Sequence, residues 1–260
     1  MLAGKKELRR MIAKIKNISY EETVFEDIHL TSQENYLLQS MLERYHNGEP
    51  LSKILNCRAF WEHDFFINGD VLDPRPETEI LIEMILERFD RQSEINFLDI
   101  GTGSGCILLS LLQEYKNAHG TGIDVSSSAI NVAKHNQKKF GIENANFIEC
   151  DWKDFFCDEK IDVIVSNPPY IRSCDISSLD ENVRSYDPLL ALDGGESGLD
   201  AYFSIAQLAK RWLKPNGCIF LEVGYDQMSS VSSILQSNNF KIFEIKKDYS
   251  DINRGIGAIL

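Results

Sequence analysis

The chain has 260 residues, of which 43% are hydrophobic and 26% are charged, and 27 Lys and Arg against 40 Asp and Glu give a formal net charge of -13. This composition is typical of a globular protein and excludes a disordered chain, a fibrous repeat and a small disulfide scaffold. A protein this acidic repels the phosphate backbone of nucleic acids unless a local basic patch compensates, so we expect no stable nucleic-acid binding.

The cysteines and the N-terminus bear on the cellular compartment. The six cysteines are scattered without a Cys-x-x-Cys pair, and the five histidines lack metal-ligand spacing, so neither a zinc site nor a disulfide framework is predicted. No apolar run reaches the roughly 18 residues of a membrane-spanning helix, and the charged N-terminus does not resemble a signal peptide. We therefore expect a cytoplasmic protein without a metal centre.

The first 55 residues predict a small helical domain whose basic and acidic residues nearly balance. Apolar residues at helical spacing predict a helix over 5–16. A second helix is expected to begin after Thr31, with Ser32 as its N-cap, and to stop at the turn 47–50. The domain also carries a cluster of Lys and Arg near the N-terminus of the chain, which could face an acidic protein partner.

Residues 56–76 predict a connector. Aromatic and β-branched residues over 57–73, with a turn signal at Asn68-Gly69, are typical of a β-hairpin or an extended segment. Asp73-Pro74-Arg75-Pro76 is expected to be extended because each proline disfavours helix at the residue before it. An amphipathic helix is then expected over 78–89.

Residues 77–260 predict an α/β domain with a mostly parallel, seven-stranded sheet covered by helices on both faces. The expected strands span 95–100, 119–125, 145–150, 161–166, 217–223, 240–247 and 255–260. The expected helices between them span 104–115, 126–140, 200–213 and 227–238.

A glycine-rich motif stands where the first of these strands ends. It comprises Asp99, Gly101, Thr102, Gly103, Ser104 and Gly105. In open α/β sheets ligands bind at the carboxyl ends of strands, and glycines let the backbone approach a ligand closely. The motif predicts a nucleotide-containing cofactor but does not choose between adenosylmethionine and a dinucleotide.

Acids at the next two strand ends extend this prediction. Asp124 follows Gly105 by 19 residues, and its two carboxylate oxygens could accept from two ribose hydroxyls; the alternative is a helix N-cap. Asp151 and Trp152 could hold an adenine by hydrogen bonding and stacking, or Trp152 could be an exposed aromatic at the start of a loop.

Asn167-Pro168-Pro169-Tyr170, directly after the apolar strand 161–166, decides between the cofactors. Two prolines make the turn rigid. The Asn167 side-chain oxygen and the Pro168 carbonyl could each accept one hydrogen of a planar amino group, while Tyr170 offers a flat face. Such a turn suits methyl transfer to nitrogen, and a dehydrogenase has no use for it.

These motifs identify the chain as resembling class I S-adenosylmethionine-dependent methyltransferases, and among them the release factor glutamine methyltransferases (the HemK/PrmC family). Further matches are Arg75-Pro76-Glu77-Thr78-Glu79, the segment Asp187-Pro188 to Gly198-Leu199, and Lys247-Asp248 with Arg254. Two residues depart from the family pattern: Asp73 replaces an apolar residue before Pro74, and Asp187 replaces a glutamate.

The resemblance implies methylation of the glutamine side-chain amide in the Gly-Gly-Gln motif of peptide chain release factors, with a Rossmann-like fold and a helical substrate-recognition domain. It also makes Arg75 and Glu77 candidates for substrate binding, although acids in a first helical turn equally suit the helix dipole. Gly194, Gly195 and Gly198 could form a mobile flap or a turn-rich loop. The competing functions are a DNA or RNA adenine amino-methyltransferase and a non-catalytic binding protein.

Overall fold

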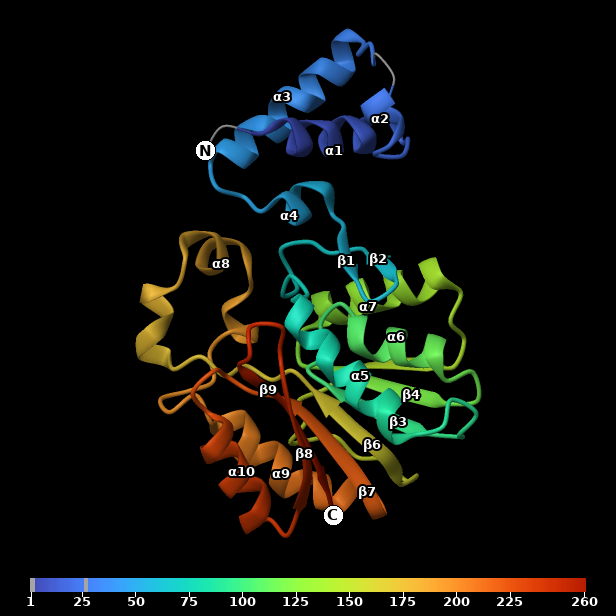
Figure 1. Cartoon of the computed structure of the whole chain (residues 1–260), viewed down its shortest axis with the longest axis vertical. Coiled ribbons are helices and arrows are strands. Elements are labelled where there is room, and N and C mark those ends of the chain that lie inside the picture. Colours follow the sequence, from blue (N-terminus) through green and yellow to red (C-terminus); the bar gives the residue numbers. More distant parts are fainter. Residues whose placement is uncertain (1–2, 26–27) are drawn as a thin grey trace.

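The computed structural model describes residues 3–25 and 28–260, and its N-terminal part is helical (Figure 1). The helices are α1 (Lys5–Lys16), α2 (Glu22–Phe25), α3 (Ser32–His46) and α4 (Leu51–Leu55). The predicted helix over 5–16 is confirmed. The predicted Ser32 cap is wrong: Thr31 caps α3 because its hydroxyl accepts from the Glu34 amide at 3.3 Å while the Glu34 carboxylate accepts from the Thr31 amide at 2.8 Å.

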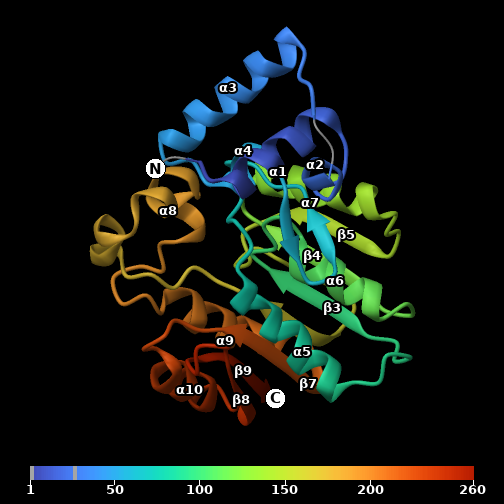
Figure 2. The same cartoon turned by 45° about the horizontal axis from the view of Figure 1, so that its top comes forward.

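The N-terminal helices have a small core of their own. Met11 of α1, Leu38 of α3 and Ile54 of α4 are buried together, so α4 packs with this unit although it leads into the rest of the chain. Figure 2, in which the top of Figure 1 is turned forward, shows α1 and α4 above the β1–β2 hairpin. The domain limits at residues 55 and 76 stay a prediction.

The connector forms a hairpin of β1 (Arg58–Phe60) and β2 (His63–Phe65), paired antiparallel. Its turn lies at residues 61–62, where Trp61 has a φ of +53°, so placing the hairpin turn at Asn68-Gly69 was wrong. Asn68 instead accepts from the Asp70 amide at 3.0 Å in a later turn. The chain continues through η1 (Pro76–Thr78) into α5 (Glu79–Arg88), which confirms the predicted helix.

The remaining chain builds the predicted seven-stranded sheet, in the order β5-β4-β3-β6-β7-β9-β8. Neighbours from β5 to β7 are parallel, and β9 runs antiparallel to both of its neighbours. The fold class is therefore confirmed. The strands are β3 (Asn96–Ile100), β4 (His119–Asp124), β5 (Ala145–Glu149), β6 (Ile161–Ser166), β7 (Leu213–Glu222), β8 (Lys241–Lys247) and β9 (Asn253–Ile259).

Helices cover both faces of the sheet because side chains alternate along each strand. Phe97 and Leu98 are neighbours in β3 but belong to two separate buried cores. The first core includes residues of α5, α6 and α7, and the second includes residues of α9 and α10. These later helices are α6 (Cys106–Glu114), α7 (Ser127–Phe140), α9 (Asp200–Trp212) and α10 (Met228–Ser237).

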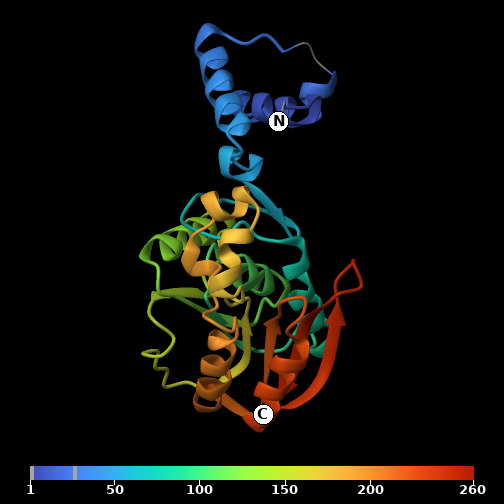
Figure 3. The same cartoon turned by 90° about the vertical axis from the view of Figure 1, so that its left-hand side faces the viewer.

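The connection between β6 and α9 leaves the sheet and rises toward the N-terminal helices (Figure 3). It carries η2 (Ser173–Ser178), α8 (Glu181–Tyr186) and η3 (Leu189–Ala191). The Tyr186 hydroxyl donates to the Asn47 carbonyl at 3.2 Å, so this connection contacts the end of α3. Across the described residues, no helix combines the length and apolar character that a membrane crossing requires.

Candidate active site

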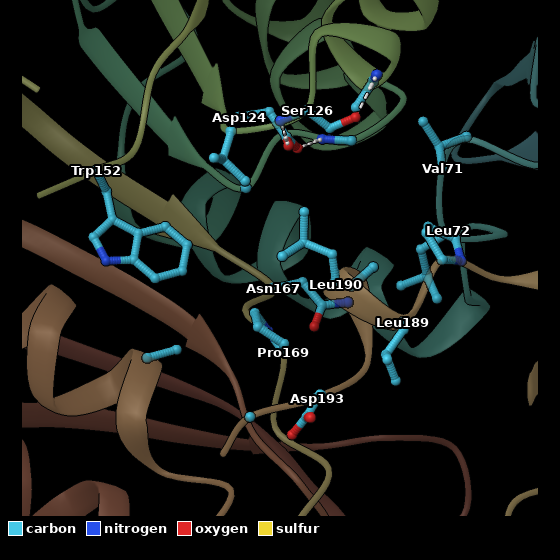
Figure 4. Close-up of a pocket in the computed structure, with 18 of the residues that line it drawn as sticks. Val71, Leu72, Asp124, Ser126, Trp152, Asn167, Pro169, Leu189, Leu190 and Asp193 are labelled. Carbon is cyan, nitrogen blue, oxygen red and sulfur yellow. Dashed lines mark hydrogen bonds between the residues drawn. The ribbon is translucent and has the colours of Figure 1, made fainter. Parts of the chain in front are cut away.

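A cavity of about 660 Å³ opens at the carboxyl ends of the parallel strands (Figure 4). The carboxyl ends of β3, β4, β5 and β6, or the segments directly after them, each contribute to its lining, through Gly101, Asp124, Trp152 and Asn167. The rest of the lining comes from residues 70–72 of the connector and from residues 188–204. The four motifs predicted from the sequence therefore meet at one place.

Glycine is required in the loop after β3. Gly101 and Gly103 line the cavity with φ of +71° and +53°, which L side chains rarely adopt, and a Cβ on Gly101 would meet no atom within 4 Å. Gly105 (φ +78°) starts α6, where a Cβ would lie 3.1 Å from Leu109. The loop thus leaves its backbone open to a ligand on the cavity side.

The other members of the motif shape the loop from behind. In the described part of the chain, the cavity lining does not include Asp99, Thr102, Ser104 or Gly105. The Thr102 hydroxyl donates to Asp99 at 2.6 Å, and the other Asp99 carboxylate oxygen is buried without a hydrogen-bond partner among the described residues. Burial raises the pKa of Asp99 from its ordinary value near 3.8 to about 7.

Asp99 gives a prediction about pH and stability. Between pH 4 and pH 7 the folded protein holds a proton on Asp99 that the unfolded chain has lost, so the free energy of unfolding falls as pH rises through this range. Each pH unit between the two pKa values lowers the free energy of unfolding by about 1.4 kcal/mol. We expect Asp99→Asn to raise the melting temperature clearly at pH 8 and little at pH 4.5. An equal increase at both values would contradict a protonated Asp99.

Asp124 is held so that its carboxylate faces the cavity. Its two oxygens accept from the backbone amides of Gly103 at 3.0 Å and of Ser126 at 2.9 Å (Figure 4). The alternative role as N-cap of α7 falls to Ser126, whose hydroxyl accepts from the Ala129 amide at 3.2 Å. Burial raises the pKa of Asp124, and the backbone amides oppose this rise. Two fixed oxygens at a cavity wall suit a pair of ligand hydroxyls.

The structure separates the predicted pair Asp151 and Trp152. Trp152 lines the cavity, and its indole nitrogen donates to the Ser204 hydroxyl at 3.0 Å, which fixes the ring. Figure 4 shows this ring across the cavity from Val71 and Leu72. Asp151 accepts from the Lys153 amide at 2.9 Å and lies outside the lining in the part of the chain described here. Of this pair, only Trp152 is placed to flank a flat ligand.

Asn167 is oriented by a chain of hydrogen bonds through Thr78, a member of the matched segment 75–79, to Glu222, which the sequence motifs did not single out. Its amino group donates to the Thr78 hydroxyl at 3.1 Å, and that hydroxyl donates to Glu222 at 2.5 Å. The second Glu222 oxygen accepts from the Tyr170 hydroxyl at 3.2 Å. Because Thr78 uses its hydrogen on Glu222, it must accept from Asn167. The Asn167 side-chain oxygen is therefore left for a ligand.

Glu222 anchors this chain from β7 and is 2% exposed. Burial raises the pKa of Glu222, while the Thr78 hydroxyl and the positive charge of Arg254 lower it. Burial also raises the pKa of Tyr170, so its hydroxyl remains a donor. Tyr170 and Pro168 lie outside the cavity lining among the described residues, whereas Asn167 and Pro169 belong to it.

The loop 194–198 packs against the turn rather than standing free. The Gly194 amide donates to the Ile171 carbonyl at 2.8 Å, and a Cβ on Gly194 would lie 2.7 Å from the Pro169 carbonyl oxygen. Gln227 ties the loop further, because its amino group donates to the carbonyls of Tyr170 at 2.9 Å and Gly198 at 3.2 Å. These contacts favour the turn-rich loop over the mobile flap.

The comparisons with known proteins agree with this geometry. A family model described as "Methyltransferase domain" matches residues 91–251. The release factor glutamine methyltransferase of Agrobacterium fabrum is 37% identical over 95% of this chain and 88% of its own length. The release factor glutamine methyltransferase of Thermodesulfovibrio yellowstonii is 35% identical over 96% of this chain and 90% of its own length. The chain belongs to the release factor glutamine methyltransferase family.

Solved structures support the fold of this family member. A methyltransferase from Pyrococcus furiosus matches with a TM-score of 0.58 and 17% identity, over 85% of this chain and 98% of that one. The ribosomal protein L11 methylase of Lactobacillus delbrueckii subsp. bulgaricus matches with a TM-score of 0.54 and 18% identity, over 73% and 81%. At these identities the likeness concerns the fold alone.

The two residues singled out by the family resemblance, Arg75 and Glu77, lie apart from the cavity. Its lining, as far as the described residues go, includes neither of them. Arg75 pairs with Asp187 at 2.8 Å, and Glu77 is exposed. In the described ranges no three His, Cys, Asp or Glu side chains come together in a group that could hold a metal ion. Substrate binding by Arg75 and Glu77 stays a prediction.

Proposed function

We propose that this protein transfers a methyl group from S-adenosylmethionine to the side-chain amide nitrogen of the glutamine in the Gly-Gly-Gln motif of peptide chain release factors. The observation that carries the proposal is the fixed orientation of Asn167, which lines the same cavity as the glycine loop and whose side-chain oxygen accepts no hydrogen bond from the described residues, in a member of this family. An amide hydrogen of the substrate needs an acceptor of this kind.

The cavity residues fit an adenosyl group. Asp124 would hold the two ribose hydroxyls, Gly101 and Gly103 would let the backbone approach the ligand, and Trp152 would flank the adenine. When bound, the cofactor would supply a methyl group on a positively charged sulfur; as the nitrogen–methyl bond forms the sulfur–methyl bond breaks, neutral S-adenosylhomocysteine leaves, and the nitrogen releases one hydrogen as a proton to water. Asp99, Thr102, Ser104, Gly105 and Asp151 would act only indirectly, since they lie outside the lining among the residues described.

The protein's own contribution is to position a weak nucleophile. The lone pair of an amide nitrogen is delocalised, so orientation has to supply much of the rate, and well-oriented systems gain about 7–11 kcal/mol. The Asn167 oxygen would accept one amide hydrogen. The carbonyl of Pro168, which lies outside the cavity lining among the described residues, is the acceptor we propose for the other, and Pro169 and Tyr170 would shape the turn. Both hydrogen bonds strengthen as positive charge develops on the nitrogen.

The N-terminal helices would recognise the protein substrate. Tyr36 and Leu37 of α3 are exposed, with 76% and 45% of their surfaces accessible, and Lys5, Lys6 and Arg10 of α1 are exposed as well. Exposed apolar residues and an exposed basic cluster on the same helical unit suit an acidic protein surface. A cytoplasmic location is also part of this proposal, because the six cysteines, all in the described part of the chain, are free thiols.

The decisive experiment uses radiolabelled S-adenosylmethionine with four separate acceptors: a release factor, its Gly-Gly-Gln glutamine-to-alanine variant, DNA and RNA. Of these four acceptors, we expect label on the unaltered release factor only. A short Gly-Gly-Gln peptide, tested separately, should be labelled more slowly than the release factor, since the peptide lacks the surface for the N-terminal helices. Label on DNA or RNA would indicate the adenine amino-methyltransferase instead. Label that survives the glutamine-to-alanine change would also overturn the proposal.

A further inference from the structure

Lys53 in α4 is a buried lysine with a full set of partners. It is 2% exposed, and a buried ammonium is costly unless its charge and its three hydrogens are satisfied. Its Nζ donates to the carbonyls of Asn68 at 2.8 Å and Val71, and lies 3.0 Å from the carboxylate of Asp187. This side chain thus joins its own helix α4 to two other segments, residues 68–71 and the segment that begins at Asp187.

Two of these segments form parts of the cavity wall. Val71 lines the cavity together with Leu72, and Asp187 directly precedes the lining residues 188–191. Figure 4 shows Val71, Leu72 and Leu189 on the side of the cavity away from Trp152. The ammonium of Lys53 therefore links the two wall segments from outside the cavity.

Apolar packing alone does not hold the second segment. Leu189 and Leu190 are 59% and 60% exposed, so neither side chain anchors this wall in a core. Leu192, just after this wall segment, is buried, and its carbonyl accepts from the Ile171 amide at 3.0 Å, so the far end is fixed there. Asp187 anchors the near end, because its carboxylate also accepts from Arg75 at 2.8 Å and from the Asp73 amide at 3.1 Å. The near end of the wall segment therefore depends on the groups that fix this carboxylate.

A second contact ties α4 to the same place. The Ser52 hydroxyl donates to Asp73 at 2.5 Å, and Arg58 Nε lies 3.3 Å from the other Asp73 oxygen. Asp73 and Asp187, the two residues that depart from the family pattern, therefore touch each other through the Asp73 amide. The neighbouring residues Ser52 and Lys53 of α4 bind one of these acids each.

We propose that Lys53 is a positioning residue that sets the spacing between wall segments 70–72 and 188–191, and thereby the affinity of the cavity for the adenosyl ligand. An apolar side chain of similar length could fill its volume but could not hold two carbonyls and a carboxylate together. The proposal deepens the proposed function, since it concerns the same cavity, and its test needs no methyl acceptor.

The test is calorimetric titration of Lys53→Met with S-adenosylhomocysteine, alongside its melting temperature. We expect the Kd to rise at least tenfold. Tyr115→Phe is the matched control, because its hydroxyl donates to the carbonyls of Ile85 at 3.0 Å and Phe89 at 3.2 Å, away from the cavity. This control should lower the melting temperature and leave the Kd unchanged.

Asp187→Asn keeps the shape of the carboxylate and removes its charge, and it covers the case in which Lys53→Met does not fold. We expect its Kd to rise about tenfold as well. The Kd of the double variant should be no higher than that of the weaker-binding single variant. A folded Lys53→Met or Asp187→Asn protein with a Kd within twofold of the wild type would overturn the positioning role. Absence of release-factor methylation would refute the proposed function and leave this binding result standing.

Discussion

Replacing Asn167 with alanine is expected to lower kcat by about 10²–10³-fold, the usual effect of removing one preorganised hydrogen-bonding group that acts on the transition state. Its free oxygen would accept from the substrate amide, and this bond gains strength only as charge develops on the nitrogen. The Kd for S-adenosylhomocysteine should stay within a fewfold of the wild type. Single-turnover methylation of a release factor and a binding titration measure the two quantities.

Thr78→Val gives a matched variant for the same site, because it removes the acceptor that fixes the Asn167 amino group and leaves Asn167 in place. We expect a smaller loss in kcat than for Asn167→Ala. Asn117→Ala serves as the control, since Asn117 donates to the Gln92 carbonyl on the exposed surface. Near-normal turnover in Asn167→Ala would show that the rate does not depend on this oxygen.

The fold was predictable because its signals are local. Strands such as β3 and β6 are apolar runs followed by a glycine-rich or proline-rich turn, and the alternation of strands with helices indicates a parallel sheet. The signal that sets the start of β7 is less local. It begins at Leu213 rather than at residue 217 because Leu213 pairs with Ile161, and a register shift follows before Cys218 pairs with Val163. A pairing of this kind depends on the partner strand.

The candidate site was only partly predictable, because some of its residues are placed by local signals and others by contacts with residues far away in the sequence. Asn167, Asp124 and Trp152 stand at strand ends, which parallel topology brings to one edge of the sheet. Glu222 gave a weaker signal, a single acid at the end of an apolar strand, and its partner Thr78 is 144 residues away. Lys53 gave none, because its burial depends on Asp187, which lies in a connection without a regular pattern.

Asp124→Ala is expected to raise the Kd for S-adenosylhomocysteine by about 10²–10⁴-fold. The carboxylate would accept from two ribose hydroxyls, and each hydrogen bond to a charged group contributes about 1.5–3 kcal/mol. Every 1.4 kcal/mol changes the affinity tenfold. The Kd of Asp124→Asn should lie between those of Asp124→Ala and the wild type, because its amide retains one acceptor oxygen for the Gly103 or Ser126 amide and loses the charge. Calorimetric titration of the three proteins measures the three Kd values.

Asp162→Ala is the matched control for Asp124→Ala, because Asp162 also accepts from a backbone amide, that of Asn96 at 2.9 Å, but at the opposite end of the sheet. It also pairs with Lys214. Its loss should lower stability and leave the Kd unchanged. If Asp124→Ala instead melts at a lower temperature but binds within threefold of the wild type, Asp124 only holds the loop and the start of α7. The ribose would then need another acceptor at this cavity.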